Sequence, residues 1–364
     1  RRSPFDKNLT DIIFFDANGK DLPSGRTKNI ERLFFGEDFP RSTRDKVGDI
    51  FFPERTTESY REKFLSSINI EAINKRKFNL VIDYSNGVAS TIFPVILGSF
   101  DCQIIATNAH LDPKRLTRDQ YEFDNSIKQL AHIVTSLKYD LGCLIDAGGE
   151  KIFVVNEHGQ VINSDRLLTI VTELFLLTNP DATTVAVPIT ASGDIDIICA
   201  RRKVKAIKTR NSHLAMMESA TNKSTRFVGG NKGGFIFTDF FFATDAMYSF
   251  VKILEMMALT DKRLGEIDAS LPHMVMSKRN VNCSWEHKGK VMRNIMRNTE
   301  GMERDLVDGV KVHLEHNKTP ASVLLLPDKE RPLFHINAEA ADVATADQLA
   351  NQYERKIIQW RDDT

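Results

Sequence analysis

Residues 140–151 read Asp-Leu-Gly-Cys-Leu-Ile-Asp-Ala-Gly-Gly-Glu-Lys, and the expected fold class follows from this segment and its neighbours. The apolar run predicts a buried strand, and the acids and glycines that follow it predict a turn. Residues 152–163 predict a β-hairpin with its tip at Gly159, and a helix is expected from about Asp165. A strand, an acidic turn, a hairpin and a helix in this order indicate an α/β protein.

The turn after the strand has the spacing of a metal-binding loop. Acids at positions i, i+2 and i+4 of a turn can direct three carboxylates at one Mg²⁺ ion. Here Asp146 and Glu150 stand at the first and third positions, whereas Gly148 at the second has no side chain. The sequence therefore predicts a metal site that lacks one ligand, so binding of Mg²⁺ is expected to be weak or absent.

The rest of the chain alternates strands and helices. A strand at 80–84, a helix to about Leu97 and a strand at 103–106 form a βαβ unit, which implies a parallel sheet. Further strands are expected at residues 12–15, 184–188, 204–209, 310–314 and 323–326, and further helices after Pro23 and at 60–68, 245–258, 288–296 and 346–360. Trp285 and Met292 are expected to lie in the core.

The composition is that of a globular protein. Lysine plus arginine and aspartate plus glutamate each total 49, so the formal net charge is zero and nothing favours a nucleic-acid partner. No apolar run reaches membrane-spanning length. Three of the four widely spaced cysteines lie in apolar runs, which indicates buried thiols in a reducing compartment such as the cytoplasm. The first residue is Arg1 rather than Met, which predicts that the sequence continues upstream.

The stretch at 146–168 resembles the metal loop of the α-D-phosphohexomutases. That loop reads Asp-Gly-Asp-Ala-Asp-Arg and is followed by an apolar run, a turn and Gly-Asp-Arg-Leu-Leu, which residues 163–168 match as Asn-Ser-Asp-Arg-Leu-Leu. Phosphomannomutases and phosphoglucomutases of this family exchange a phosphate between C1 and C6 of a hexose through a phosphoserine, with Mg²⁺ held by three aspartates.

The resemblance implies successive mixed-sheet α/β domains of the phosphohexomutase type plus a smaller α+β domain at the C-terminus. On this frame the chain divides into a remainder of the first domain, a metal-loop domain, a sugar-loop domain and a phosphate-loop domain, at residues 1–76, 77–181, 182–277 and 278–364.

The resemblance also implies where the catalytic groups lie, and each of these positions departs from the family. Ser3 stands at the phosphoserine position, but as a serine before proline it is more typical of a plain turn. Lys151 replaces the arginine of the metal loop, which gives up bidentate phosphate binding. Asn231 and Lys232 lie in the Gly-rich stretch 229–234, where the family binds sugar hydroxyls through a glutamate and a serine.

The phosphate-binding loop of the family reads Arg-Pro-Ser-Gly-Thr-Glu-Pro, and residues 326–332 read Leu-Pro-Asp-Lys-Glu-Arg-Pro in its place. Lys329 and Arg331 are candidate phosphate-binding residues, because they could offset the two acids of the loop. The alternative is an exposed, charged hairpin turn. Since four loops are altered together, we expect an intact fold with little mutase chemistry.

Two further stretches are similar to the mutase-like C-terminal half of bacterial mannose-1-phosphate guanylyltransferases. They are residues 283–293, which read Cys-Ser-Trp-Glu-His-Lys-Gly-Lys-Val-Met-Arg, and residues 332–335, which read Pro-Leu-Phe-His. This similarity implies a degenerate module attached to a sugar nucleotidyltransferase domain in nucleotide-sugar biosynthesis. Such a module would bind hexose phosphate weakly or serve assembly and regulation, in a homo-oligomer. An active phosphomannomutase or phosphoglucomutase and a structural scaffold without ligand are the alternatives.

Overall fold

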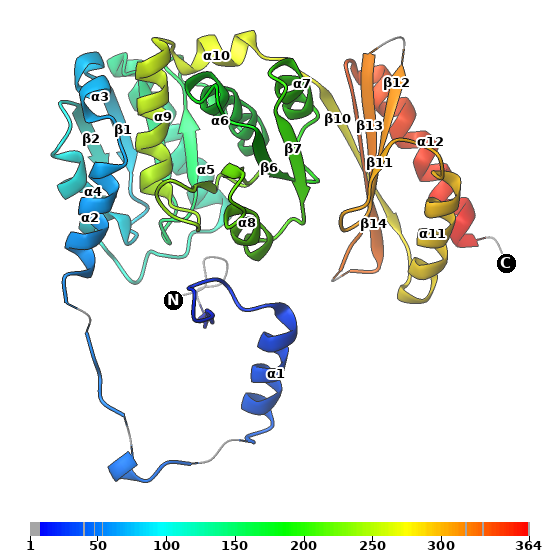
Figure 1. The fold of residues 1–364 in the computed structure, drawn as a ribbon, viewed down its shortest axis with the longest axis horizontal. Coiled ribbons are helices and arrows are strands. Elements are labelled where there is room, and N and C mark those ends of the chain that lie inside the picture. The colour runs from blue at the N-terminus through cyan, green and yellow to red at the C-terminus, as the bar shows by residue number, and fades with distance from the viewer. Residues whose placement is uncertain are drawn as a thin grey trace. The chain divides into compact units, whose positions relative to one another are not determined.

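In a computed structural model of the chain, the described residues are 8–38, 41–46, 48–52, 54–316, 319–329 and 331–362. They form two compact units, one of Arg1–Ile162 with Gly234–Asp261 and one of Asn163–Gly233 with Lys262–Thr364. Figure 1 draws the ribbon with the element labels used below. The elements of the first unit are α1 (Ser24–Phe35), the 3-10 helix η1 (Arg44–Lys46), α2 (Thr56–Ser66), α3 (Ile70–Arg76), β1 (Asn79–Asp83), α4 (Ala89–Leu97), β2 (Gln103–Thr107), α5 (Gln120–Leu137), β3 (Leu141–Ile145), β4 (Ile152–Val155), β5 (Val161–Ile162), β9 (Phe235–Phe237) and α9 (Ala246–Thr260).

The first unit is built on a five-stranded sheet with the order β2-β1-β3-β4-β5. β1 pairs in parallel with β2 on one side and with β3 on the other, and β4 and β5 continue as an antiparallel hairpin. Leu80, Val81 and Ile82 of β1 are fully buried, because helices cover both faces of a parallel sheet and leave no polar face for alternation. The strand order reverses between β2 and β3, so β1 and β3 flank a topological switch point, where α/β sheets commonly bind ligands.

Helix α5 covers this sheet with an apolar face that includes Leu130 and Val134, which pack against Val81 and Leu144. A Cβ at Gly142 of β3 would lie 2.8 Å from the Val134 side chain, so the close packing of helix on strand depends on this glycine. The helix begins at Asp119 in a capping box with Glu122.

The second unit contains α6 (Ser164–Thr178), β6 (Thr184–Pro188), α7 (Asp194–Arg201), β7 (Lys205–Thr209), α8 (His213–Ala220), β8 (Thr225–Gly229), α10 (Leu264–Ser270), β10 (Val275–Asn282), α11 (Trp285–Asn298), β11 (Arg304–Asp305), β12 (Val310–His316), β13 (Thr319–Pro327), β14 (Leu333–Ala340) and α12 (Val343–Asp362). β6 pairs in parallel with both β7 and β8. The C-terminal part is an antiparallel sheet with the order β10-β14-β13-β12-β11. α11 and α12 pack on it through a core that includes Val291, Ile295, Ile357 and Trp360.

The predicted fold class is confirmed: mixed α/β sheets follow one another, and the C-terminal part is rich in β-structure. The strands and helices expected beyond residue 79 are all present, within a few residues of the predicted bounds. Within the described ranges, none of the helices is long and apolar enough to cross a membrane. None of the four cysteines forms a disulfide, and Cys143, Cys199 and Cys283 are buried as expected.

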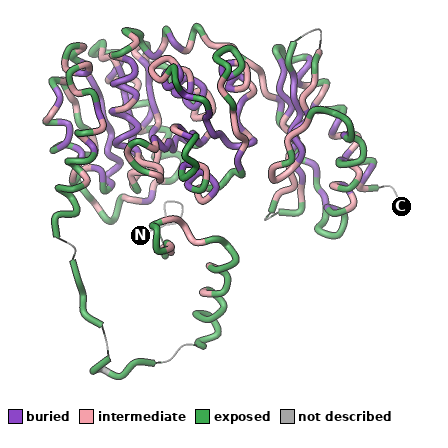
Figure 2. Tube along the Cα trace, in the orientation of Figure 1, coloured by how far each residue is buried: buried purple, intermediate pink, exposed green. Residues whose placement is uncertain are grey.

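The strand predicted at residues 12–15 is wrong. Phe15 forms one isolated antiparallel bridge to Asp21 across a turn at Gly19, and no ladder extends from it within the described residues. The apolar side chains that suggested a strand stay in solvent, with Ile12 71% and Phe15 56% exposed. Helix α1 forms where predicted, but it buries no residue, and the tube of this N-terminal part is largely green in Figure 2.

Candidate functional site

The acidic loop after β3 is closed by its first acid. Asp146 Oδ1 accepts hydrogen bonds from the backbone N–H groups of Glu150 (2.7 Å) and Lys151 (2.8 Å). The turn also needs Gly149, which has φ +73° and donates its N–H to the Asp146 carbonyl. Burial raises the pKa of Asp146, although these two backbone donors oppose the shift. Asp146 therefore shapes the loop, and a cation would have to bind through its other oxygen.

A second loop, at the end of β1, lies directly against the acidic loop. Val88 N–H donates to the Ala147 carbonyl at 3.2 Å. A Cβ at Gly87 would lie 2.6 Å from both Cα and O of Ala147, so only glycine allows this approach. The Asn86-Gly87 turn of the sequence is thus a packing requirement of the acidic loop.

Asp146, Glu150 and Lys151 line one cavity of about 500 Å³ in the first unit, so the structure brings these three predicted residues together. Within the described part of the chain, no group of three or more His, Cys, Asp or Glu side chains is placed to hold a metal ion. Mg²⁺ is commonly bound through one or two carboxylates together with substrate phosphate. The two carboxylates are oxygen ligands of the kind that Mg²⁺ binds, so Asp146 and Glu150 are the residues of this loop that would hold the ion.

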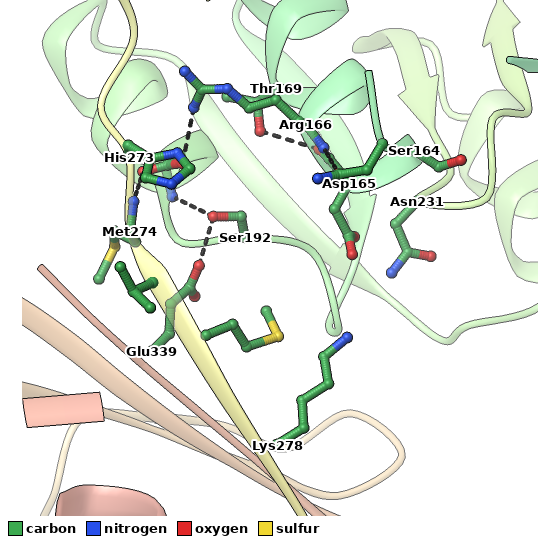
Figure 3. Close-up of a pocket in the computed structure, with 14 residues that line it drawn as sticks. Ser164, Asp165, Arg166, Thr169, Ser192, Asn231, His273, Met274, Lys278 and Glu339 are labelled. Atoms are coloured by element: carbon green, nitrogen blue, oxygen red, sulfur yellow. Dashed lines mark hydrogen bonds and ion pairs between the residues drawn. The ribbon is translucent and has the colours of Figure 1, made fainter. Parts of the chain in front are cut away.

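Asn231 lies in a different cavity, also of about 500 Å³, in the second unit. The walls come from the start of α6, the loops after β6 and β8, β10 with the segment that leads into it, and β14. They include Asp165, Arg166, Ser192, Asn231, Lys278 and Glu339. Figure 3 shows the side chains of Asp165, Asn231 and Lys278 directed toward a common space. Among the described residues, Asp165 Oδ1 and Asn231 Oδ1 are buried without a hydrogen-bond partner. We call this cavity the Asn231 pocket.

Charge in the Asn231 pocket is distributed unevenly. Burial raises the pKa of Asp165, and the charge of Lys278 and the Asn231 amide oppose that shift. Asn231 itself is held by a hydrogen bond from Nδ2 to Thr190 Oγ1 at 3.0 Å, which fixes the amide orientation. The pocket therefore offers two acceptor oxygens that need donors, next to an ammonium group that suits an anion.

The other charged side chains of the pocket form hydrogen bonds that connect the segments lining it. Arg166 donates to the Pro272 carbonyl (2.5 Å), to Asp194 Oδ2 (3.3 Å) and to Asp268. Glu339 of β14 accepts from Ser192 Oγ (2.5 Å) and from the Gly193 N–H (2.8 Å). Burial raises the pKa of Asp194 to about 6, with Glu339 adding to the shift. Arg166 and Glu339 are therefore positioning residues.

A charged turn joins β13 to β14, and Asp328, Lys329 and Arg331 are its described residues. Asp328 Oδ1 accepts from the Arg331 N–H at 2.8 Å, and its Oδ2 accepts from Arg331 Nε at 3.1 Å. Lys329 Nζ binds Asp308 at 2.8 Å. Both predicted phosphate-binding cations are paired with acids, although their side chains are about 70% exposed, and Lys232 is exposed as well.

The prediction that Trp285 lies in the core is wrong. Trp285 is 55% exposed, and the ammonium group of Lys288 lies over its ring at 3.7 Å from the centroid. Lys288 Nζ also donates to the carbonyls of Asp328 and Arg331 (2.6 Å to Arg331), so it links helix α11 to the turn between β13 and β14. Met292 packs against the C-terminal core, as expected. Ser3, the predicted phosphoserine position, lies outside the described residues.

Sequence reasoning did not single out Asp165, Lys278 or Glu339 as site residues. Asp165 lies in the stretch 163–168 that resembles the family, but an acid in the first turn of a helix is common because it interacts favourably with the helix dipole. Glu339 offered one signal, because it is the only charged residue in the strand Leu333–Ala340 and is nevertheless 3% exposed.

The chain is similar to known proteins over most of its length. The family model described as phosphoglucomutase/phosphomannomutase, alpha/beta/alpha domain II, matches residues 58–159, and that of domain III matches residues 163–275. The phosphoglucomutase/phosphomannomutase of Thermococcus kodakarensis is 27% identical over 330 residues, which cover 90% of this chain and 71% of that protein. The phosphoglucosamine mutase of Methanocaldococcus jannaschii is 26% identical over 345 residues, which cover 93% and 75%.

Solved structures show the same fold. A phosphoglucomutase/phosphomannomutase family protein from Burkholderia thailandensis has a TM-score of 0.76 at 17% identity, covering 95% of this chain and 72% of its own. The N-acetylphosphoglucosamine mutase of Aspergillus fumigatus, in complex with GlcNAc-6P and magnesium, has a TM-score of 0.58 at 14% identity, covering 86% and 72%.

The fold and the two cavities define a multidomain α/β protein with a carboxylate loop at the carboxyl end of a parallel sheet. Together with the matches to both family domains, they identify the lineage: the chain belongs to the α-D-phosphohexomutase superfamily.

Proposed function

We propose that this chain binds hexose phosphates and interconverts their 1- and 6-phosphates slowly. The observation that carries the proposal is the Asn231 pocket, in which the buried oxygens Asp165 Oδ1 and Asn231 Oδ1 have no donor among the described residues. Sugar hydroxyls are donors, and each would give one of these oxygens its missing hydrogen bond. Lys278 supplies the positive charge that a phosphate requires.

The relatives support the substrate class. Their names concern phosphates of glucose, mannose and glucosamine, all of which carry several ring hydroxyls or an amine next to a phosphate. In the proposed reaction, one sugar oxygen gains a phosphoryl group from a phosphoserine, for which Ser3 is the candidate, and the other sugar oxygen returns its phosphoryl group to that serine. The sugar is isomerised, and the protein ends as it began.

The acidic loop of the first unit contributes the metal-binding part of the proposal. Asp146 and Glu150 would hold Mg²⁺, which neutralises charge on the transferring phosphoryl group when it is bound. Because Gly148 supplies no third carboxylate, we expect half-saturation at millimolar Mg²⁺ and a turnover below about 1 s⁻¹, the low end for enzymes.

Binding of glucose 1-phosphate by calorimetry tests the role of the pocket. We expect Asn231→Ala to weaken binding about 2- to 10-fold, the range for one hydrogen bond. The matched control Asn298→Ala changes an exposed asparagine of α11 and should leave the affinity unchanged. Equal affinities of wild type and Asn231→Ala would remove the pocket from the proposal.

A second candidate function is that of a degenerate module, attached to a sugar nucleotidyltransferase of the mannose-1-phosphate guanylyltransferase type, which binds hexose phosphate for regulation or assembly into a homo-oligomer. Two observations favour it: Gly148 in the acidic loop, and the pairing of Lys329 and Arg331 with acids. This candidate predicts binding of mannose 1-phosphate without formation of mannose 6-phosphate at any Mg²⁺ concentration.

A further inference from the structure

We propose that the first unit binds a neutral, ring-bearing small molecule with one hydroxyl or carbonyl group, in the cavity that the acidic loop also lines. The pocket is the apolar side of the cavity next to the acidic loop, and we call it the Ser85 pocket. It lies between the carboxyl ends of β1 and β3, at the topological switch point of the sheet. The whole cavity, acidic loop included, has a volume of about 500 Å³, within the range of small-molecule sites.

The walls of the Ser85 pocket are largely apolar. Leu116, Phe123, Leu144 and Phe153 line it, and the rings of Phe123 and Phe153 meet edge to face with centroids 4.8 Å apart. Leu116, Phe123 and Phe153 are each only partly buried, so they present apolar surface to the cavity. A ring that packs against these side chains would remove that surface from water.

The floor of the pocket contains an unsatisfied hydroxyl. Ser85 is 3% exposed, and its Oγ has no hydrogen-bond partner within the described part of the chain. Ser85 and Asn86 both adopt left-handed backbone conformations, with φ +52° and +53°, a region that asparagine tolerates better than serine. Asp83 Oδ1 holds this conformation by accepting the Ser85 N–H at 2.7 Å. A ligand hydroxyl or carbonyl would satisfy the Ser85 hydroxyl.

The charged groups around the pocket argue against an anionic ligand. Arg118 is engaged by Asp83 (3.4 Å) and Ser126 (3.0 Å). The start of α5 is already capped, because Asp119 Oδ1 accepts from the Glu122 N–H and Glu122 Oε2 accepts from the Asp119 N–H. The acidic loop adds two carboxylates on the rim and one lysine. Among the described residues on the apolar side of the cavity, Arg118 is the one cation, and it is paired. The ligand proposed there is therefore neutral, whereas a transferring phosphoryl group would lie at the acidic loop with Mg²⁺.

The test uses the full chain and two fluorinated probes of nearly equal shape, 4-fluorobenzyl alcohol and 4-fluorotoluene, titrated by ¹⁹F NMR. We expect saturable binding of both, with the alcohol bound about 3- to 10-fold more tightly because of one hydrogen bond. In Ser85→Ala this preference should disappear while the toluene affinity stays the same. Leu116→Trp should fill the cavity and abolish binding of both probes, and Val88→Phe serves the same purpose if Leu116→Trp fails to fold.

Three results would overturn the inference. The first is the absence of saturable binding at millimolar probe. The second is binding that survives a folded cavity-filling variant, and the third is an alcohol preference that survives Ser85→Ala. Failure of the mutase assay leaves these readouts unaffected, so the two proposals fail separately.

Discussion

Gly87→Ala should destabilise the first unit through the contact between its two loops. The added Cβ would lie 2.6 Å from both Cα and O of Ala147, whereas ordinary contacts begin at about 3.4 Å. The obstacle is backbone, which cannot rotate away, and the hydrogen bond from Val88 N–H to Ala147 would be displaced with it. Overpacking of this kind costs about 1–3 kcal/mol.

For a unit of this size, each kcal/mol lowers Tm by about 2–4 °C, so we expect a decrease of about 2–12 °C in thermal unfolding followed by circular dichroism. The matched control is Gly289→Ala in α11, where the nearest atom, on Arg293, lies at an ordinary 3.7 Å. Alanine is favoured in a helix interior by about 0.5–1 kcal/mol, so this control should leave Tm equal or higher. A Tm for Gly87→Ala within 1 °C of wild type would refute the close approach of the two loops.

Three further predictions concern charge. The raised pKa of Asp194, about 6 against an ordinary 3.8, means that the folded state binds this proton more tightly, so stability is lost as pH rises between these values. The stability of wild type relative to Asp194→Asn should therefore fall by about 2 kcal/mol between pH 4 and pH 7 in urea unfolding, and a constant difference would contradict this. Gly148→Asp should tighten Mg²⁺ binding at least 10-fold in calorimetry, because it supplies a third carboxylate. Asp146→Asn is the control and should weaken binding. Micromolar Mg²⁺ binding by wild type would contradict our account of the loop. Lys288→Met should release the 328–331 turn and shift the Trp285 fluorescence, whereas an unchanged spectrum would show that the ammonium group is not over the ring.

The sheet of the first unit was predictable because parallel strands are buried on both faces and therefore appear in the sequence as continuous apolar runs. Leu80, Val81 and Ile82 form a continuous apolar run, and all three are fully buried, as a strand covered on both faces requires. The acidic turn was equally clear from its glycines and its carboxylates. The function of Asp146 in closing that turn was not predictable. An aspartate that accepts hydrogen bonds from backbone N–H groups is the same residue type as an aspartate that binds a metal, so the sequence does not distinguish the two roles.

The Asn231 pocket could not be predicted as a whole. Asp165, Asn231, Lys278 and Glu339 come from four elements that are far apart in the chain, and no local pattern links them. The apolar residues near the N-terminus were misleading, because their local pattern is that of a strand but the pairing that a strand needs is not local. Ile12 and Phe15 have strand-forming side chains, but a strand also requires a partner, and one bridge is all that the described residues provide.

The most direct test of the proposed function is ³¹P NMR of the full chain with glucose 1-phosphate and a trace of glucose 1,6-bisphosphate, over a range of Mg²⁺ concentrations. The account predicts slow appearance of the glucose 6-phosphate resonance, at less than about 1 s⁻¹, rising with millimolar Mg²⁺ and lost in Ser3→Ala. Complete absence of this resonance at saturating Mg²⁺, in a sample that binds the sugar phosphate by calorimetry, would contradict mutase activity and leave the binding module as the function.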